Sequence, residues 1–349
     1  MNEVLCEVQS TGLATITLNR PKAINSLTYG MLKEIHQKLK EWETDENVQL
    51  VLLQGAGEKG FCAGGDIKSL YEARSSHQAY QHAVAFFEEE YEVDHYIYSY
   101  PKPIVACLDG VVMGGGVGLS YGARYRIVTD RTKWAMPEMN IGFFPDVGAA
   151  HFLNKAPGYI GRYLALTAEV IPGADTMYIH AADTFIPSDK VTNFIGELER
   201  TNWGEVHVDN ELLHLIQQYS QEPSPRATLP TYQKEIDECF SHQRVEDIMD
   251  ALEKQGTEFA RKTREQLLSK SPASLKVTLK QLMEGEGASR EECFRTDLIL
   301  AKQFMHHEDF YEGVRSVLVD KDRTPNYIYQ SLADVSDELV ASFFKPPHS

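Results

Sequence analysis

Hydrophobic residues in the first part of the chain follow two different periods, and each period predicts a different element. Residues 4–18 alternate between apolar and polar side chains on both sides of the polar stretch QSTG, which predicts a β-hairpin. From Ser26 to Thr44 the apolar residues recur every three or four positions, which predicts an amphipathic helix. The two periods therefore place a hairpin and a helix at the start of the chain.

Further along, short apolar runs alternate with helical stretches. The runs at 49–57, 104–110 and 124–130 are rich in aliphatic residues and predict buried strands. Residues 80–100 predict a long helix that ends before Pro101. Strands and helices alternate in this way up to about residue 190, which favours an α/β fold.

The pattern changes after Phe194, where helical periodicity dominates to the end of the chain. A proline-rich connector, SQEPSPRATLPTY, interrupts the helices of this part. We therefore predict two domains, a mixed core over residues 1–195 and a helical C-terminal region over residues 196–349.

The composition narrows the possible partners. The 349 residues include 34 basic and 51 acidic ones and carry a net charge of −17, so neither nucleic acid nor an anionic membrane is an expected partner. The start of the chain lacks the basic and apolar regions of a signal peptide. The apolar run from Ile104 contains Asp109 and several glycines, which makes it a poor membrane span. We expect a cytoplasmic protein.

The cysteines and histidines give no sign of a metal or disulfide framework. The five cysteines are far apart and none forms a CxxC pair, so zinc knuckles and a disulfide framework are not expected. The histidines are scattered without ligand spacing, and we interpret them as structural.

Two glycine-rich segments follow predicted strands. In FCAGGD, residues 61–66, small residues let the backbone approach a ligand closely, although Asp66 capping an ordinary strand-to-helix turn explains the same pattern. In MGGGVG, residues 113–118, the spacing does not fit the dinucleotide fingerprint. This second segment therefore serves either close helix packing or the presentation of a backbone N–H to an oxyanion.

Two acids lie within an apolar stretch at residues 134–152. Glu138 and Asp146 each follow a proline, and glycines lie close by. Charged groups are costly to bury unless they are paired or used. Each acid alone is equally explained by a helix cap or a structural ion pair, but the two together suggest a site.

The order of these segments resembles the crotonase (enoyl-CoA hydratase/isomerase) family. The matching stretches are ITLNRPKAINSL, FCAGGDI, GVVMGGGVGLSYGARYRI and AMPEMNIGFFPDVG, in that order. The resemblance implies a crotonase-like ββα spiral core that binds acyl-CoA, followed by a C-terminal helical domain. It also implies an oxyanion hole for the thioester carbonyl, formed by the N–H groups of Gly65 and Gly115.

The resemblance further implies the ligand and its contacts. Coenzyme A enters as part of the substrate, so no separate cofactor and no metal are expected, and the chain is either a monomer or a homo-oligomer based on trimers. The residues that the family pattern places near coenzyme A are Lys22, Ala23, Ala63, Asp66, Ile67 and Lys68.

The departures from the family pattern point to one branch of it. Hydratases of the family use two glutamates; the first would stand at Gly118, and the second matches Glu138. Asp146 stands where hydratases typically have glycine. These features resemble the branch of the family that hydrolyses 3-hydroxyisobutyryl-CoA in valine breakdown. That branch also has a segment like FFEEEY here, and its substrate-contacting glutamate matches Glu90.

The branch resemblance implies a thioester hydrolase in which Glu138 and Asp146 are catalytic. Two alternatives stay open. One is enoyl-CoA hydration or isomerisation with Glu138 acting alone, and the other is an acyl-CoA-binding protein without catalytic activity.

Overall fold

The computed structural model describes residues 2–347 as a mixed α/β protein, which confirms the predicted fold class. The chain forms two compact units that interleave along the sequence. The first, here the strand unit, comprises Met1–Gly65, Glu89–Trp134 and Ile171–Thr228. The second, here the helical unit, comprises Asp66–Glu88, Ala135–Val170 and Leu229–Ser349. The boundary expected near residue 195 stays a prediction.

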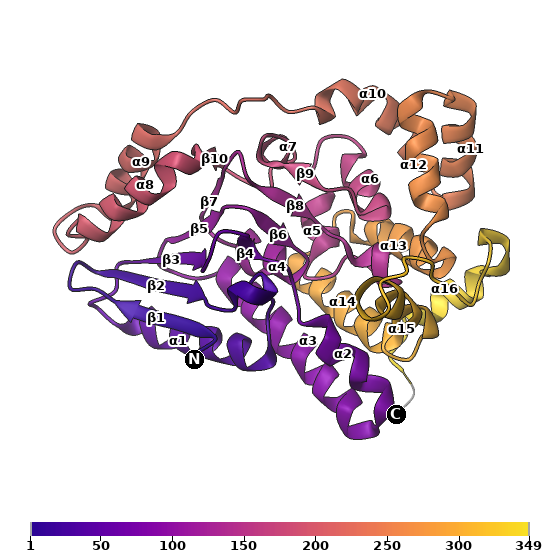
Figure 1. Ribbon diagram of the computed structural model, residues 1–349, viewed down its shortest axis with the longest axis horizontal. Coiled ribbons are helices and arrows are strands. Elements are labelled where there is room, and N and C mark those ends of the chain that lie inside the picture. The colour runs from indigo at the N-terminus through magenta and orange to yellow at the C-terminus, as the bar shows by residue number, and fades with distance from the viewer. Residues whose placement is uncertain (1, 348–349) are drawn as a thin grey trace. The chain divides into compact units, whose positions relative to one another are not determined.

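The strand unit contains a six-stranded sheet in the order β1-β2-β3-β5-β7-β10 (Figure 1). Val4 pairs with Leu18 across the antiparallel strands β1 and β2, which confirms the predicted hairpin, and the remaining pairs are parallel. The strands are β1 (Val4–Val8), β2 (Leu13–Leu18), β3 (Leu50–Gly55), β5 (Ile104–Leu108), β7 (Tyr125–Val128) and β10 (Thr184–Phe185). All five residues of β5 are buried, as expected for a central parallel strand.

A second, four-stranded sheet brings the two glycine segments together. Its order is β4-β6-β8-β9, with β4 (Gly60–Cys62), β6 (Val111–Met113), β8 (Lys133–Ala135) and β9 (Ile171–Pro172). Strands β4 and β6 are parallel neighbours, so their carboxyl ends lie at the same edge of the sheet. Each glycine segment begins at one of these ends. The topology thus makes neighbours of two turns that are about fifty residues apart in the sequence.

Helix α1 (Tyr29–Thr44) confirms the predicted amphipathic helix but begins three residues later than the pattern suggests. The Thr28 side chain caps it by accepting a hydrogen bond from the Met31 N–H at 3.2 Å. Residue Leu27 is not helical because its N–H donates to the Gly64 carbonyl at 2.8 Å and ties the chain to the first glycine turn.

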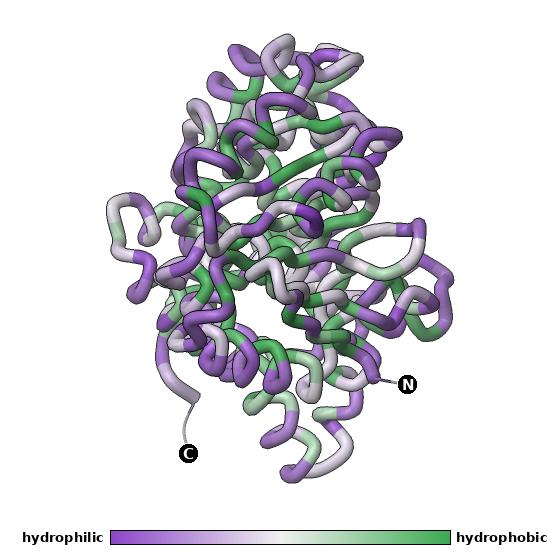
Figure 2. The backbone as a smooth tube through the Cα atoms, turned by 90° about the vertical axis from the view of Figure 1, so that its left-hand side faces the viewer, coloured by the Kyte–Doolittle hydropathy of each residue, from purple (hydrophilic) through white to green (hydrophobic). Residues whose placement is uncertain are grey.

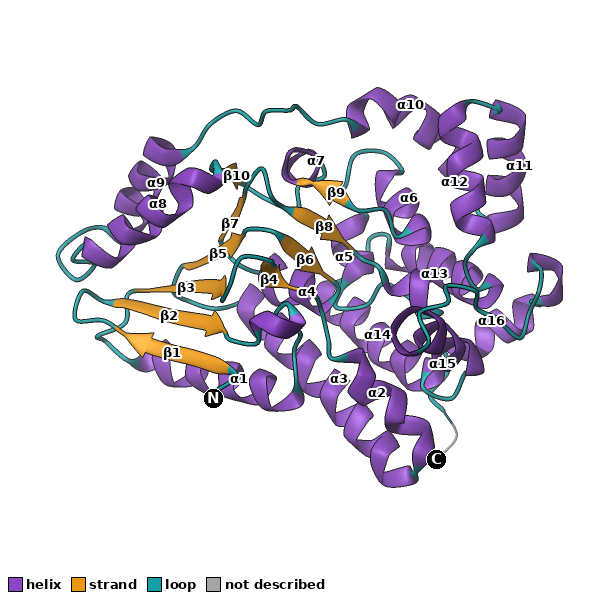
Figure 3. Cartoon of the chain, in the orientation of Figure 1, coloured by secondary structure: helices purple, strands orange, loops and turns teal. Residues whose placement is uncertain are grey.

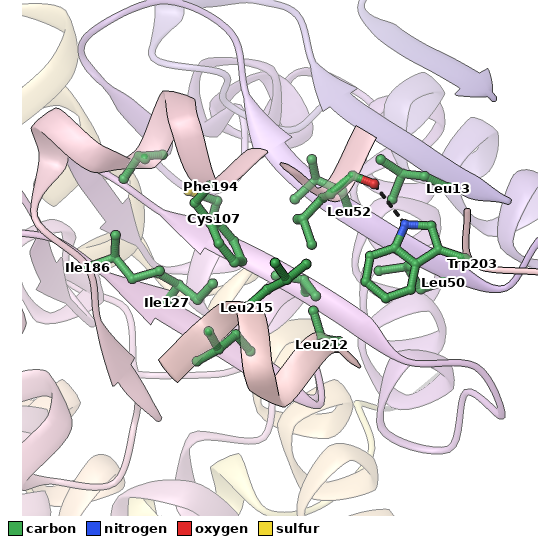
Figure 4. Packing of buried hydrophobic residues seen from close by; sticks show 14 residues of the cluster. Leu13, Leu50, Leu52, Cys107, Ile127, Ile186, Phe194, Trp203, Leu212 and Leu215 are labelled. Atoms are coloured by element: carbon green, nitrogen blue, oxygen red, sulfur yellow. Dashed lines mark hydrogen bonds between the residues drawn. The ribbon is translucent and has the colours of Figure 1, made fainter. Parts of the chain in front are cut away.

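The core of the strand unit lies between the large sheet and two helices, α8 (Ser188–Arg200) and α9 (Val208–Tyr219), as Figure 4 shows. Trp203 is fully buried there, and its indole N–H donates to the Leu198 carbonyl at 2.7 Å. Shorter elements of this unit are η1 (Pro21–Ala23), α4 (Gly115–Tyr121) and α7 (Gly173–Tyr178). The long helix α3 (His77–Tyr98) is shared by the two units, which divide it after Glu88.

In the part of the helical unit that the structure describes, the regular elements are helices, apart from the last residue of β8 (Figure 3). Hydrophobic and hydrophilic positions alternate along the chain (Figure 2), as expected when each helix buries one face. Its elements are α2 (Ile67–Tyr71), η2 (Glu72–Ser75), η3 (Glu138–Ile141), α5 (Ala149–Leu153), α6 (Ile160–Thr167), α10 (Leu229–Phe240), α11 (Val245–Gln255), α12 (Glu258–Leu268), α13 (Pro272–Gly285), α14 (Arg290–Phe304), α15 (Glu308–Val314), η4 (Arg315–Val319), η5 (Leu332–Asp334) and α16 (Asp337–Phe343). Within residues 2–347 we find no helix that is both long and apolar enough to cross a membrane.

Candidate active site

The glycine turns of the strand unit have the backbone geometry that only glycine adopts easily. Gly64 has a φ of +100°, and Gly115 is the first residue of α4. A side chain at Gly115 would collide with a carboxylate oxygen of Glu90, so this position accepts no Cβ atom without a local shift. The sequence therefore needs glycine at both positions for steric reasons, independently of any reaction.

Two backbone N–H groups, those of Gly65 and Gly115, lie close together at these turns. The Gly65 nitrogen is 3.3 Å from the point that a Cβ of Gly115 would occupy. Because Gly115 begins α4, its N–H has no acceptor within that helix. Among residues 2–347 no backbone acceptor is found for either N–H. Two donors in this arrangement can bind one oxygen atom that carries negative charge.

Glu90 lies beside the same pair of amides. It is 3% exposed and comes from α3, and its carboxylate approaches the Cα atom of Gly115. Burial is the main cause that raises the pKa of the nearby Cys62 thiol to about 12, and the charges of Glu90 and Asp94 contribute to that rise. The strand unit thus unites Gly65, Gly115 and Glu90, while a contact of Glu90 with substrate stays a prediction.

Three of the residues proposed for coenzyme A lie close together in the strand unit. Lys22 and Ala23 are exposed on the short helix η1. The Ala63 N–H donates to the Ile24 carbonyl at 2.9 Å, which holds the end of β4 against that helix. These three residues therefore share one region, and their contact with coenzyme A stays a prediction.

The other three belong to the helical unit. Asp66 precedes α2, which starts with Ile67 and Lys68, and Lys68 is exposed. The side chain of Asp66 makes no capping hydrogen bond to α2; instead its backbone carbonyl accepts from the N–H and hydroxyl of Ser69. The alternative explanation of Asp66 as a capping side chain is therefore not what the structure shows.

Glu138 and Asp146, the two acids of the apolar stretch, are both buried in the helical unit. Glu138 is the first residue of η3 and is 8% exposed, while Asp146 lies in the loop before α5 and is 5% exposed. The Phe143 N–H donates to the Glu138 carbonyl at 3.2 Å, and Gly142 has a φ of +64°. This turn reverses the chain so that the second acid returns towards the first.

The charge of one carboxyl group acts on the other. Burial is the largest cause that raises the pKa of Glu138 well above its usual value, and the charge of Asp146 is the second. The Oε2 atom of Glu138 is buried without a hydrogen-bond partner in the described part of the chain. No ion pair of Glu138 is found among the described residues either, so the structural ion pair considered for it is not supported.

A third buried acid, Asp297 on α14, belongs to the same cluster and was missed in the sequence. It is fully buried, and both burial and the charge of Asp146 raise its pKa well above the usual value. The only signal in the sequence is its position on the apolar face of α14, between Cys293 and Leu300. That face gives no indication of which distant loop it contacts.

Metal binding has no support in the geometry. Among residues 2–347 no group of three or more histidine, cysteine, aspartate or glutamate side chains is arranged to hold a metal ion. The five cysteines are all free thiols. The expectation of a reaction without metal stays a prediction.

Comparison with known sequences places the whole chain in one family. The model described as enoyl-CoA hydratase/isomerase matches residues 13–344. The curated 3-hydroxyisobutyryl-CoA hydrolase of Danio rerio is 41% identical over 98% of this chain and 89% of its own length. The Homo sapiens protein of the same name is 38% identical over 98% of this chain and 88% of its own length.

Two solved structures that are described as enzymes with other activities have the same fold as this chain. A carnitinyl-CoA dehydratase from Mycobacterium thermoresistibile has a TM-score of 0.92 at 37% identity, covering 99% of this chain and 97% of its own. An enoyl-CoA hydratase from Rhodobacter sphaeroides has a TM-score of 0.89 at 34% identity, covering 99% of this chain and 98% of its own. The likeness extends through the helical tail, which the motifs alone covered loosely.

The expected cytoplasmic location is wrong by these comparisons. The hydrolases of Danio rerio, Mus musculus and Homo sapiens are each named as mitochondrial. The expectation rested on the absence of a signal peptide for secretion, which carries no information about import into an organelle.

Proposed function

Since this chain belongs to the enoyl-CoA hydratase/isomerase family, we propose that it hydrolyses 3-hydroxyisobutyryl-CoA to 3-hydroxyisobutyrate and coenzyme A. The curated relatives support this substrate, because they carry that name and align with nearly the whole chain. The observation that carries the proposal is the buried pair of Glu138 and Asp146, since Asp146 stands where hydratases of the family typically have glycine.

In the proposed reaction the N–H groups of Gly65 and Gly115 bind the thioester carbonyl oxygen. They stabilise the negative charge that develops on it, and each such donor is worth about 3 kcal/mol in the transition state. Their free, adjacent N–H groups support this role. Glu90, which lies beside them, contacts the acyl part of the substrate.

Glu138 takes part in the attack on the carbonyl carbon in one of two ways. As a nucleophile, its carboxylate forms a C–O bond, the C–S bond breaks, and the coenzyme A thiolate leaves and takes a proton. Water then hydrolyses the mixed anhydride and restores Glu138. As a general base, Glu138 takes the proton of a water molecule that attacks directly. Asp146 orients either that water or the 3-hydroxyl group.

A single turnover in heavy-oxygen water tests the anhydride route. Label in the Glu138 carboxylate after one turnover supports the anhydride, whereas an unlabelled Glu138 with labelled product excludes attack of water on the glutamyl carbon of an anhydride and is the result expected for direct attack by water or for attack on the acyl carbon of an anhydride. The protein is digested and the peptide that contains Glu138 is weighed by mass spectrometry.

Hydration of an enoyl-CoA is the second candidate, favoured by the solved hydratase at 34% identity. In the two-glutamate reaction of the family the first acid would stand at Gly118, which is buried and has no side chain. A hydratase would therefore have to work with Glu138 alone.

The decisive experiment compares two substrates on one preparation. Release of free thiol from 3-hydroxyisobutyryl-CoA and hydration of crotonyl-CoA are measured in parallel. Thiol release without hydration supports the hydrolase. Hydration without thiol release moves the protein to the hydratase reaction, and binding of acyl-CoA without either reaction identifies a binding protein.

A further inference from the structure

The loop that carries Asp146 is held at both ends by two side chains from the C-terminal helices. The Gln281 amide on α13 donates hydrogen bonds to the Pro145 carbonyl and to Oδ1 of Asp297, both at 2.8 Å. The other oxygen of Asp297, on α14, accepts the Gly148 N–H at 2.8 Å. Residues on both sides of Asp146 are therefore bonded to one connected pair of side chains.

The backbone of this loop is strained, so it needs such support. Val147 has a φ of +50° and Gly148 a φ of +80°. A β-branched residue in the left-handed region costs about 1–3 kcal/mol, which persists only where the surroundings fix the conformation. Gln281 and Asp297 are 1% and 0% exposed, so their hydrogen bonds to the loop are shielded from competing water.

The chemistry of the contact also explains why residue 297 is an acid. Two donors, the Gly148 N–H and the Gln281 amide, converge on it. A carboxylate offers two acceptor oxygens and no donor, whereas asparagine would turn its NH₂ group towards one of the two donors. Burial and the charge of Asp146 make an ionised acid costly at this place, and the hydrogen bonds from the two donors offset part of that cost.

We propose that Gln281 and Asp297 form a clamp that fixes Asp146 in its working position, which makes both of them positioning residues for thioester hydrolysis. This inference rests on the proposed function and extends it to two residues that touch the loop rather than the substrate. If this is so, Gln281 and Asp297 affect the reaction only by positioning Asp146.

Another aspartate of the helical unit, which also accepts from a backbone N–H and a glutamine amide, provides a control. Asp237 on α10 accepts the Tyr159 N–H and the Gln233 amide through Oδ1, both at 2.8 Å. Because both bonds use one oxygen, the asparagine of Asp237→Asn can keep them through Oδ1, so this variant makes the same Asp-to-Asn change without the loss of an acceptor, at a loop that carries neither Glu138 nor Asp146.

The test compares Asp297→Asn and Gln281→Met with Asp237→Asn by steady-state kinetics on 3-hydroxyisobutyryl-CoA. We expect kcat to fall up to ~10²-fold in the two clamp variants with KM little changed, because a small misplacement of a reacting group has such effects. Asp237→Asn is expected to keep the kcat of the unchanged protein. Equal kcat values in Asp297→Asn and Asp237→Asn would overturn the clamp.

A double variant separates positioning from a general loss of folded protein. Once Asp146→Asn has removed the group that the clamp serves, adding Asp297→Asn should lower kcat no further. A multiplied loss in the double variant overturns the proposal, because it means that Asp297 acts independently of Asp146. If Asp297→Asn does not fold, Gln281→Met with Asp146→Asn gives the same test with Asp297 left in place.

Hydrogen exchange keeps the clamp testable if the proposed function fails. Without any thioester hydrolysis by the unchanged protein, the function is wrong and so is the catalytic consequence of the clamp. The exchange rate of the Gly148 amide then tests whether Asp297 holds the loop. Compared with the unchanged protein, this amide should exchange faster in Asp297→Asn and at the same rate in Asp237→Asn. Equal exchange at Gly148 in both variants overturns the clamp itself.

Discussion

The carboxyl groups of Glu138 and Asp146 are buried close enough for the charge of Asp146 to raise the pKa of Glu138. Two acids in this situation do not ionise independently, because the first charge makes the second more costly. Glu138 is the group whose pKa is raised, by burial first and by the charge of Asp146 second. This relationship determines how both activity and stability respond to pH.

Removing either carboxylate should abolish most thioester hydrolysis. We expect Glu138→Gln and Asp146→Asn each to lower kcat/KM by roughly 10²-fold or more, since a positioned acid or base contributes about that much. Both replacements keep the volume of the side chain, so the fold should persist. Thiol release measures the effect, and Glu253→Gln, at an exposed position, is the control. Normal turnover in Glu138→Gln and Asp146→Asn would contradict their catalytic role.

The pH profile of the unchanged protein should have an acid limb set by Glu138. Whether it attacks or takes a proton, Glu138 must be ionised, so kcat/KM should rise as the pH passes through its raised pKa. In Asp146→Asn the neighbouring charge is gone, the pKa of Glu138 falls, and the limb of the residual activity should move to lower pH. A limb at the same pH in both proteins would show that another group controls it.

Stability should depend on Glu138 in the opposite sense. Its pKa is higher in the folded protein than in the unfolded chain, so over the window between the two values the folded state holds a proton that the unfolded state has lost. Raising the pH through that window lowers the free energy of unfolding. Glu138→Gln carries no such cost, and its melting temperature should exceed that of the unchanged protein near pH 8.

The comparison at low pH provides the control for this prediction. Below the unfolded pKa of about 4.3 the glutamate is protonated in both states, and the advantage of Glu138→Gln should vanish. Melting curves at about pH 4 and pH 8 measure the difference. An advantage of the same size at both values would assign it to packing instead of ionisation.

A methyl group at Gly115 should disturb the pair of amides. Gly115→Ala brings a Cβ atom against the Glu90 carboxylate, and relief of that contact moves the Gly115 N–H. We expect kcat to fall about 10²-fold, the effect of losing one donor to an oxyanion. Gly30→Ala is the matched control, because its Cβ would meet nothing closer than 3.8 Å. Equal kcat values in these two variants would argue against the role of Gly115.

The sequence predicted the elements and residues whose evidence is local. The hairpin of β1 and β2, helix α1 and the glycine turns each carry a short-range pattern, and the structure confirms them. The start of α1 was placed too early because the bond from the Leu27 N–H to Gly64 connects distant residues. No periodicity contains that information.

The three buried acids differ in the same way, because two of them have local evidence in the sequence and the third does not. Glu138 and Asp146 stood out because prolines and apolar neighbours surround them within a few positions. Asp297 did not, because on α14 it is one acid within an ordinary amphipathic helix, and its partners Gln281 and Gly148 lie far away in the chain. Residues that support a site from another segment become visible only in three dimensions.

The bond between Gly148 and Asp297 closes a loop of 149 residues, which has a consequence for biosynthesis. A nascent chain that has released residue 148 from the ribosome has the acids Glu138 and Asp146 but not yet the side chain of Asp297, which bonds to the loop that carries Asp146. The pair can reach its final geometry only when most of the polypeptide has been translated. Chains that stop before α14 should therefore lack the Asp297 acceptor for the Gly148 N–H.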